Sequence, residues 1–252
     1  ADTGTQRWEF PTEEDKIKEI FHATPAVGEG LVFVGSYSNN LYALDVDTGK
    51  KRWSFATGGP IIANPVVSGD TVYVGSADHR LYALEASSGT KQWEFETGNW
   101  VWAPPLITGG SLYLSSMDHK VYQLNAENGQ KEWEFQTGGA IADAPFLAED
   151  TLYFGAFDRK VYALDLETDE TRWEFVAEGW IWGSPLVVSD TLYVGSLDKK
   201  VYALEARSGE KIWEFSTNGA VRASPVLTDG ILYVSSEDGQ IYALEAESGE
   251  QK

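Results

Sequence analysis

Two pairs of tryptophans, each spaced as Trp-x-Trp, are the side chains of this sequence best suited to hold a ligand. In each pair the residues stand five and three positions before a proline of a series that recurs every 40 residues. Paired indole rings offer large apolar surfaces, and a cleft between two such pairs would suit a flat or apolar group. Exposed tryptophan also anchors protein interfaces. The candidate ligand-binding residues, all near the same repeat position, are Trp100, Trp102, Trp180, Trp182, Asp143, Arg222 and His22.

The neighbours of these tryptophans leave two interpretations open. Between the two pairs, the equivalent stretch offers only Ala140, Ala142 and Asp143, so aromatic walls would flank a small-residue notch. The alternative is that the tryptophans fill a central channel as packing. A second variable ring is expected on the same face, either as an apolar interface patch or as local packing on each repeat. It consists of Tyr37, Ala77, Met117, Phe157, Leu197 and Glu237.

Catalytic chemistry finds little support in the sequence. The three histidines, His22, His79 and His119, lie in different repeats without metal-ligand spacing. No Ser-His-Asp arrangement, phosphate-binding loop or paired-acid site can be placed. The absence of cysteine excludes disulfides, zinc–thiolate sites and cysteine nucleophiles. We therefore expect no catalytic residue, no metal site and no cofactor.

The charge of the chain restricts its partners. Its 252 residues include 39 acidic and 19 basic side chains, for a formal charge of -20. Nucleic acid and anionic membranes are poor partners because they would be repelled. The acidity fits a halophilic source, in which salt screens the self-repulsion, or ordinary acidic solubility. No apolar run approaches the ~18 residues of a membrane span. We expect a monomer that binds a peptide, a protein or a small molecule.

The strands that would position these residues are predicted from a repeat in the sequence. Three independent series, of tryptophan, tyrosine and proline, recur with a common period of 40 residues from the second tryptophan onward. In the second repeat, turn residues separate four runs of β-type sequence, and four strands in about 40 residues are typical of a propeller blade. The predicted strands of that repeat are Ile61–Ser68, Thr71–Ser76, Arg80–Ala86 and Thr90–Thr97. The series are Trp8, Trp53, Trp93, Trp133, Trp173 and Trp213; Tyr42, Tyr82, Tyr122, Tyr162, Tyr202 and Tyr242; and Pro25, Pro65, Pro105, Pro145, Pro185 and Pro225.

The sequence thus predicts an all-β fold, a six-bladed β-propeller of four-stranded antiparallel blades in a single domain over residues 1–252. The last repeat stops before its tryptophan, and residues 5–10 carry the missing outer strand. We expect this N-terminal strand to complete the last blade and close the ring, which would remove two open strand edges. An open stack is the alternative. The blades are expected at about 20–57, 60–97, 100–137, 140–177, 180–217 and 220–250.

One segment of the repeat resembles a known motif. The stretch from Ala43 to Trp53 reads A-x-D-x-x-T-G-x-x-x-W, and relaxed copies end at the later tryptophans. This is similar to the tryptophan-docking motif of quinoprotein (PQQ-type) propeller repeats, and the resemblance covers nearly the whole chain. It implies that the tryptophan of one blade stacks against the next blade.

The resemblance implies two kinds of function. Enzymes of that family have eight blades and use a quinone with Ca²⁺, typically beside a vicinal disulfide, whereas this chain has six repeats and no cysteine. The chain is therefore closer to the non-enzymatic binding members, with a ligand or peptide at the channel mouth. The alternatives are a PQQ- and calcium-dependent dehydrogenase and a ligand-free structural or engineered scaffold. The resemblance also implies an extracellular, periplasmic or cell-surface location.

Overall fold

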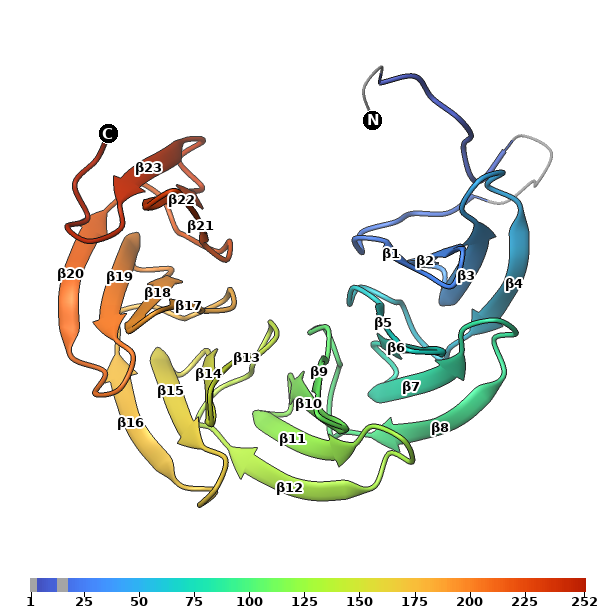
Figure 1. The fold of residues 1–252 in the computed structure, drawn as a ribbon, viewed down its shortest axis with the longest axis horizontal. Coiled ribbons are helices and arrows are strands. Elements are labelled where there is room, and N and C mark those ends of the chain that lie inside the picture. Colours follow the sequence, from blue (N-terminus) through green and yellow to red (C-terminus); the bar gives the residue numbers. More distant parts are fainter. Residues whose placement is uncertain (1–3, 13–17) are drawn as a thin grey trace. The chain divides into compact units, whose positions relative to one another are not determined.

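The computed structural model describes residues 4–12 and 18–252, and all regular structure in this part of the chain is β (Figure 1). The strands of the first three sheets are β1 (Ala26–Gly28), β2 (Leu31–Gly35), β3 (Asn40–Asp45), β4 (Lys51–Ala56), β5 (Val66–Ser68), β6 (Thr71–Gly75), β7 (Arg80–Glu85), β8 (Lys91–Glu96), β9 (Leu106–Thr108), β10 (Ser111–Ser116), β11 (Lys120–Asn125) and β12 (Lys131–Gln136). Those of the last three are β13 (Phe146–Ala148), β14 (Thr151–Gly155), β15 (Lys160–Asp165), β16 (Thr171–Val176), β17 (Leu186–Val188), β18 (Thr191–Gly195), β19 (Lys200–Glu205), β20 (Lys211–Ser216), β21 (Val226–Thr228), β22 (Ile231–Ser235) and β23 (Ile241–Glu245).

Each sheet is formed by strands that follow one another in the chain, as a series of hairpins. Five sheets in the described residues have four strands, and the sixth, β21-β22-β23, has three. In the second sheet, β6 pairs antiparallel with β7 and β7 with β8, with a register shift between Ala83 and Leu84. The all-β class and the six repeats of the sequence therefore correspond to six antiparallel sheets.

Burial explains why these segments are strands. Leu81, Tyr82, Ala83 and Leu84 of β7 are all at most 5% exposed, as an apolar strand covered on both faces requires. The outer strand β8 alternates instead, with Trp93 buried and both neighbouring side chains exposed. This alternation gives one dry and one wet face.

The first strand of each sheet is shorter than the sequence predicts. β5 contains only Val66–Ser68, whereas the predicted strand begins at Ile61. The main chain before β5 bonds elsewhere: the Ile61 amide donates to the Ser36 carbonyl of the first sheet at 3.0 Å, and the Pro60 carbonyl accepts from Ala77 at 2.9 Å. Pro65 has no N–H to offer a ladder. The segment is therefore an irregular connection bonded to two turns.

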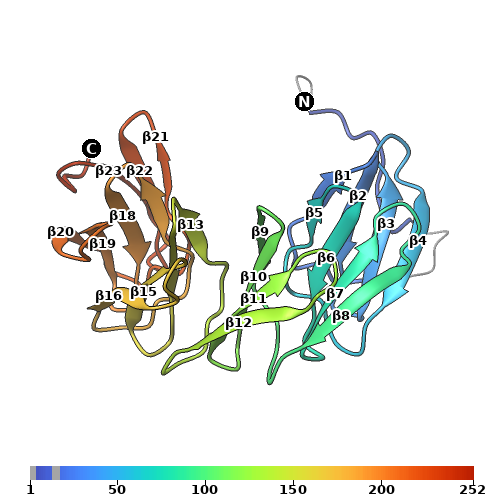
Figure 2. The same cartoon turned by 60° about the horizontal axis from the view of Figure 1, so that its bottom comes forward.

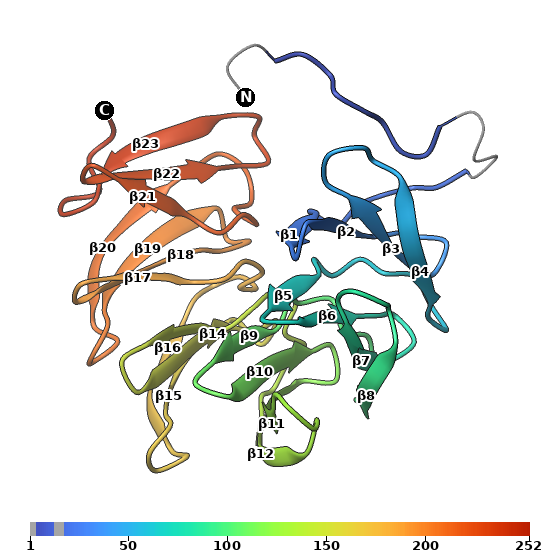
Figure 3. The ribbon, with the colours of Figure 1, turned by 45° about the vertical axis from the view of Figure 1, so that its right-hand side comes forward.

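The chain divides into two compact units. Unit 1 comprises the residues up to Asp118 together with Tyr122–Trp133, and unit 2 comprises His119–Val121 together with Glu134–Lys252. Within unit 1, β1 lies beside β5 (Figure 2). The fully buried Phe33 and Leu84 belong to one core cluster of the first two sheets. Within unit 2, the sheet β17–β20 lies beside β21–β23 (Figure 3), with Leu232 in their shared core.

Neighbouring sheets within a unit are joined by the repeated tryptophans. The Trp53 indole donates to the Ala86 carbonyl of the second sheet at 2.9 Å, and Trp173 makes the same bond to Ala206 at 2.9 Å. Gly89 lies directly under the Trp53 ring with φ at 73°, and a Cβ there would come within 2.7 Å of the indole. Glycine is required at this position both for the left-handed backbone and for the close approach.

The N-terminal segment does not form the predicted outer strand. Residues 4–12 form no strand, and the last sheet has three strands without them. The Trp8 indole donates to the Val46 carbonyl at 3.0 Å and covers Gly49 of the first sheet, which is the contact that Trp53 makes with Ala86 and Gly89 of the second sheet. At the other terminus, Gln251 bridges to Leu244 and begins a fourth strand of the last sheet itself. Closure of a ring and a single domain over 1–252 stay predictions.

Candidate binding surface

The two variable rings of the sequence are joined by main-chain hydrogen bonds. In each repeat, the amide of the turn residue after the second strand donates to the carbonyl of the residue five positions before the proline. The Phe157 amide thus donates to Ala140 at 2.9 Å, and the Leu197 amide donates to Trp180 at 2.9 Å. The loop that carries the tryptophans and the turn that carries the second ring are therefore fixed side by side, as the sequence predicts.

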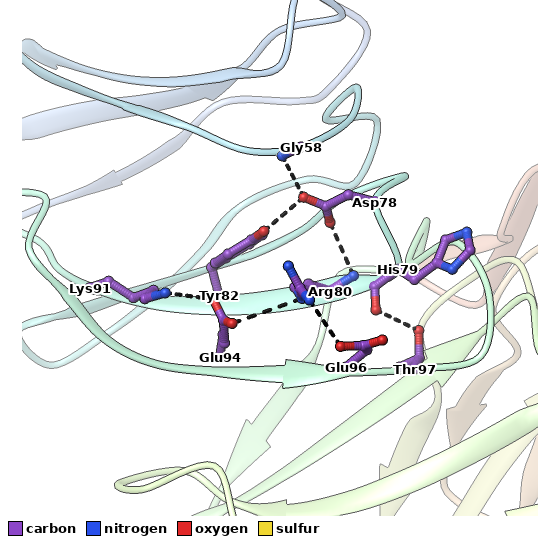
Figure 4. Close-up of polar contacts among 9 residues, drawn as sticks. All are labelled: Gly58, Asp78, His79, Arg80, Tyr82, Lys91, Glu94, Glu96 and Thr97. Carbon is purple, nitrogen blue, oxygen red and sulfur yellow. Dashed lines mark hydrogen bonds and ion pairs between the residues drawn. The ribbon is translucent and has the colours of Figure 1, made fainter.

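A buried tyrosine and a turn aspartate hold this turn in every sheet but the first. In the second sheet, the Asp78 carboxylate accepts from the Gly58 amide at 2.6 Å and from the Tyr82 hydroxyl at 2.7 Å (Figure 4). Burial and this carboxylate raise the pKa of Tyr82 to about 12. The next residue, His79, has φ at 73°, its carbonyl accepts from Thr97, and its imidazole points away from the network. The turn therefore presents this one side chain outward.

In unit 2 these loops and turns carry an aromatic cluster. We define the aromatic cluster as Phe157, Trp180, Trp182, Arg222 and Glu237. Phe157 stacks on Trp180 with ring centroids 4.9 Å apart and an interplanar angle of 11°. It also contacts Trp182 at 4.8 Å, and the Arg222 guanidinium lies 4.4 Å from the Trp182 ring centroid. Glu237 pairs with Arg222. Trp180 stays 47% exposed. Three successive repeats thus contribute to one apolar surface.

Asp143 ties the loops beneath the cluster together. Its carboxylate accepts from the Ser184 amide at 2.9 Å, from the Ser224 hydroxyl at 3.1 Å and from the Ala144 amide at 2.8 Å. The Ser184 hydroxyl in turn donates to the Ala144 carbonyl at 2.6 Å. Asp143 therefore links the entry loops of three repeats, so its carboxylate positions the surface that carries the tryptophans.

The other tryptophan pair lies in unit 1 and has different neighbours. Trp100 and Trp102 stack on each other with centroids 5.3 Å apart and an angle of 26°. Trp100 is 42% exposed, whereas the ring nitrogen of Trp102 is buried without a hydrogen-bond partner. His22 contacts Tyr37 edge-on at 5.8 Å, in the first repeat of the same unit.

The seven predicted site residues therefore fall into two sets. Trp180, Trp182, Asp143 and Arg222 come together in unit 2, whereas Trp100, Trp102 and His22 belong to unit 1. The predicted cleft between the two tryptophan pairs, with its notch, stays a prediction. Ala140 and Ala142 are buried. The sequence did not single out Ser184 and Ser224, because a serine beside a proline carries no signal of the carboxylate that reaches it.

A calcium-dependent quinone site would need several oxygen ligands close together. Within residues 4–12 and 18–252, no three His, Asp or Glu side chains are placed to share a metal ion. The residues described here do not fit such a site, and we derive no step through it. The described residues also offer no helix of the length and apolarity that crossing a membrane requires.

Comparisons with known proteins agree with the fold. The crystal structure of BamB from Moraxella catarrhalis superimposes with a TM-score of 0.82 at 21% identity, covering 93% of this chain and 76% of that one. The computationally designed Ika8 protein gives a TM-score of 0.80 at 13% identity, covering 92% and 73%. The fold is thus that of a β-propeller. No curated protein matches the sequence.

The family comparison covers the whole chain. The family described as outer membrane protein assembly factor BamB matches residues 1–101, 97–179 and 157–252. The three matches overlap, as expected when one repeat unit recurs along the sequence. The resemblance to PQQ-type propeller repeats is confirmed, and this chain belongs to the BamB family.

Proposed function

We propose that this chain is a non-catalytic binding module that holds a protein or peptide on the aromatic cluster of unit 2. The observation that carries the proposal is the state of Trp180, which is 47% exposed although Phe157 fixes its ring by parallel stacking. A rigid apolar plane in water loses little conformational entropy when a partner covers it. Covering the exposed part of one indole would contribute about 2–3 kcal/mol.

The family supports the same kind of role. BamB is described as an outer membrane protein assembly factor, and we infer that such a role involves binding other proteins. For this chain we propose a partner protein, and a periplasmic or cell-surface location, by the same analogy. A small molecule is the alternative ligand of the cluster. A protein or peptide fits better, because side chains of three repeats form an open surface there and not an enclosed pocket.

The cluster can be tested with a matched pair of variants. Trp180→Ala removes the exposed ring of the cluster, and Trp100→Ala removes the equivalent ring in unit 1, which is 42% exposed and stacks on Trp102. An array of immobilised synthetic peptides should contain sequences that the protein binds, that Trp180→Ala loses and that Trp100→Ala retains. Equal binding by the protein and Trp180→Ala would contradict the proposal.

A separate titration addresses the dehydrogenase alternative. The protein is mixed with the quinone cofactor and Ca²⁺, and the absorbance of the quinone is followed. We expect no shift, since the described residues supply no shared metal ligands. A saturable shift that depends on calcium would contradict the non-catalytic assignment.

A further inference from the structure

Ion pairing in unit 2 is uneven. Among the described residues of this unit, eight lysines and arginines form an ion pair with a carboxylate. Arg159 and Lys199 form none, although both are exposed and the chain as a whole has a charge of -20. The paired cations are Lys120, Lys160, Arg172, Lys200, Arg207, Lys211, Arg222 and Lys252.

The two unpaired cations occupy one structural position in successive repeats. Arg159 and Lys199 have φ at 73° and 72°, the conformation of His79 in the second sheet. Their carbonyls are fixed by the amides of Ala177 and Thr217, at 2.9 and 2.8 Å. As Figure 4 shows for His79, this leaves the side chain pointing away from the turn.

Both cations adjoin the aromatic cluster. Arg159 lies two residues after Phe157, and Lys199 lies two residues after Leu197, whose amide donates to the Trp180 carbonyl at 2.9 Å. The turns that stack or hold Trp180 therefore also carry the two unpaired positive charges.

The acids of the same loops form no ion pair with these cations, because their oxygens face other donors. Asp158 and Asp198 accept from the hydroxyls of Tyr162 and Tyr202, at 2.6 and 2.8 Å, and from main-chain amides of the entry loops. Asp143 is held by two serines, and Glu237 is paired with Arg222. Glu178 is the exposed acid of the loop before Trp180. Arg159 and Lys199 are therefore exposed charges of these turns without a carboxylate partner in the described residues, and each can pair with a carboxylate of a ligand.

We propose that the aromatic cluster binds an acidic peptide segment of its partner. This inference rests on the proposed function and names the chemistry of the ligand. An apolar, aromatic or proline side chain would cover Trp180, and Asp or Glu carboxylates on either side would pair with Arg159 and Lys199. The charge of -20 would repel a nucleic acid along its whole length, whereas a short acidic segment needs to pair only with these two cations.

The test uses the full chain and two synthetic peptides that share one apolar sequence around a central tryptophan. One carries glutamates at the flanking positions and the other carries lysines at the same positions. Calorimetric titration should detect binding of the glutamate peptide alone, weakened roughly tenfold, or about 1.4 kcal/mol, in Arg159→Glu/Lys199→Glu. Raising the salt to about 0.5 M should weaken it as well, because screening acts over a few ångströms there.

The matched control is Lys50→Glu/Lys51→Glu, which makes the same change in net charge on the first sheet of unit 1. It should leave the affinity for the glutamate peptide unchanged, and circular dichroism should show every variant folded. Arg159→Gln/Lys199→Gln should give a smaller loss than the charge reversal.

The other outcomes separate this inference from the proposed function. Binding of the lysine peptide, lost in Trp180→Ala, would overturn the acidic ligand and leave the binding module standing. Tighter binding of a single-stranded oligonucleotide than of the glutamate peptide would also overturn it. Binding of neither peptide overturns the inference, and the peptide array with Trp180→Ala then decides the proposed function alone.

Discussion

The two Trp-x-Trp loops occupy the same place in the repeat, yet they build different surfaces. In unit 1, Trp100 and Trp102 stack on each other, and the turn of the preceding sheet offers only Ala77. In unit 2, the equivalent turn residue is Phe157, which contacts both Trp180 and Trp182. The residue that the preceding repeat supplies therefore decides the arrangement of the same Trp-x-Trp pair. With Ala77 the two indoles stack on each other, and with Phe157 they join the aromatic cluster.

The residue supplied by the following repeat differs as well. Arg222 lies over Trp182 and brings Glu237 with it, whereas Ala142 stands at the position that corresponds to Arg222 one repeat after Trp102. A guanidinium over an indole face contributes about 0.5–2 kcal/mol and keeps the ring oriented. The candidate functional residues of this repeat protein are thus those that differ from the residues at the same position of the other repeats. Several neighbouring repeats must differ together to form one surface.

The largest expected effect separates structural tryptophans from those of the cluster. Trp173 is 9% exposed and donates to Ala206, so Trp173→Ala should lower the free energy of unfolding by about 3–5 kcal/mol. Trp180→Ala should cost less, about 2 kcal/mol, because about half of the ring is already in water. Urea denaturation measures both. A loss of comparable size in Trp180→Ala would show that this ring is packing, as in the channel-plug interpretation.

Much of this contrast is visible in the sequence. The period places Trp173 in the scaffold and marks Trp180 as a departure, and it also marks Phe157 and Arg222. It cannot show that the Phe157 ring lies parallel to Trp180, because stacking depends on how far one loop reaches toward the next.

Two further features could not be predicted because they depend on competing main-chain partners. The first strand of each sheet loses its early residues when amides such as that of Ile61 bond to the preceding sheet. Residues 2–7 and 247–252 carry copies of one turn, and sequence alone does not decide which copy extends the last sheet. In the structure Gln251 pairs with Leu244.

The next effect concerns the loops beneath each tryptophan pair. Asp143→Ala should lower the free energy of unfolding by about 2 kcal/mol, because the Ser224 hydroxyl loses its acceptor and the Ser184 amide keeps only the Ser224 oxygen. Unit 1 links its loops with Asn64, whose side chain accepts only from the Thr24 amide, at 2.7 Å. Asn64→Ala should therefore cost about 1 kcal/mol. Equal losses in the two variants would contradict the special role given to Asp143.

A smaller effect should convert one tryptophan surface into the other. Phe157→Ala removes the ring between Trp180 and Trp182, and it should cost about 1–2 kcal/mol for two aromatic contacts of a half-buried side chain. The two indoles are then expected to stack as Trp100 and Trp102 do, which near-ultraviolet circular dichroism would record as a stronger tryptophan signal. Ala77→Phe is the converse variant in unit 1. An unchanged spectrum in Phe157→Ala would contradict the assignment of the difference to this residue.

The smallest effect tests whether the two surfaces stand on the same scaffold. The pKa of Tyr82 is raised to about 12, by burial first and then by Asp78, and burial together with Asp158 also raises that of Tyr162. The folded state therefore holds these phenolic protons more tightly than the unfolded chain, whose tyrosines titrate near pH 10. Their contribution to stability is complete below pH 10 and is lost as the pH rises toward 12. Tyr82→Phe and Tyr162→Phe should each reduce this alkaline loss by a similar amount, at a cost of about 1 kcal/mol at neutral pH, measured by urea denaturation from pH 8 upward. A clear difference between the two variants would mean that the turns themselves differ, and that the residues at their tips do not alone account for the two surfaces.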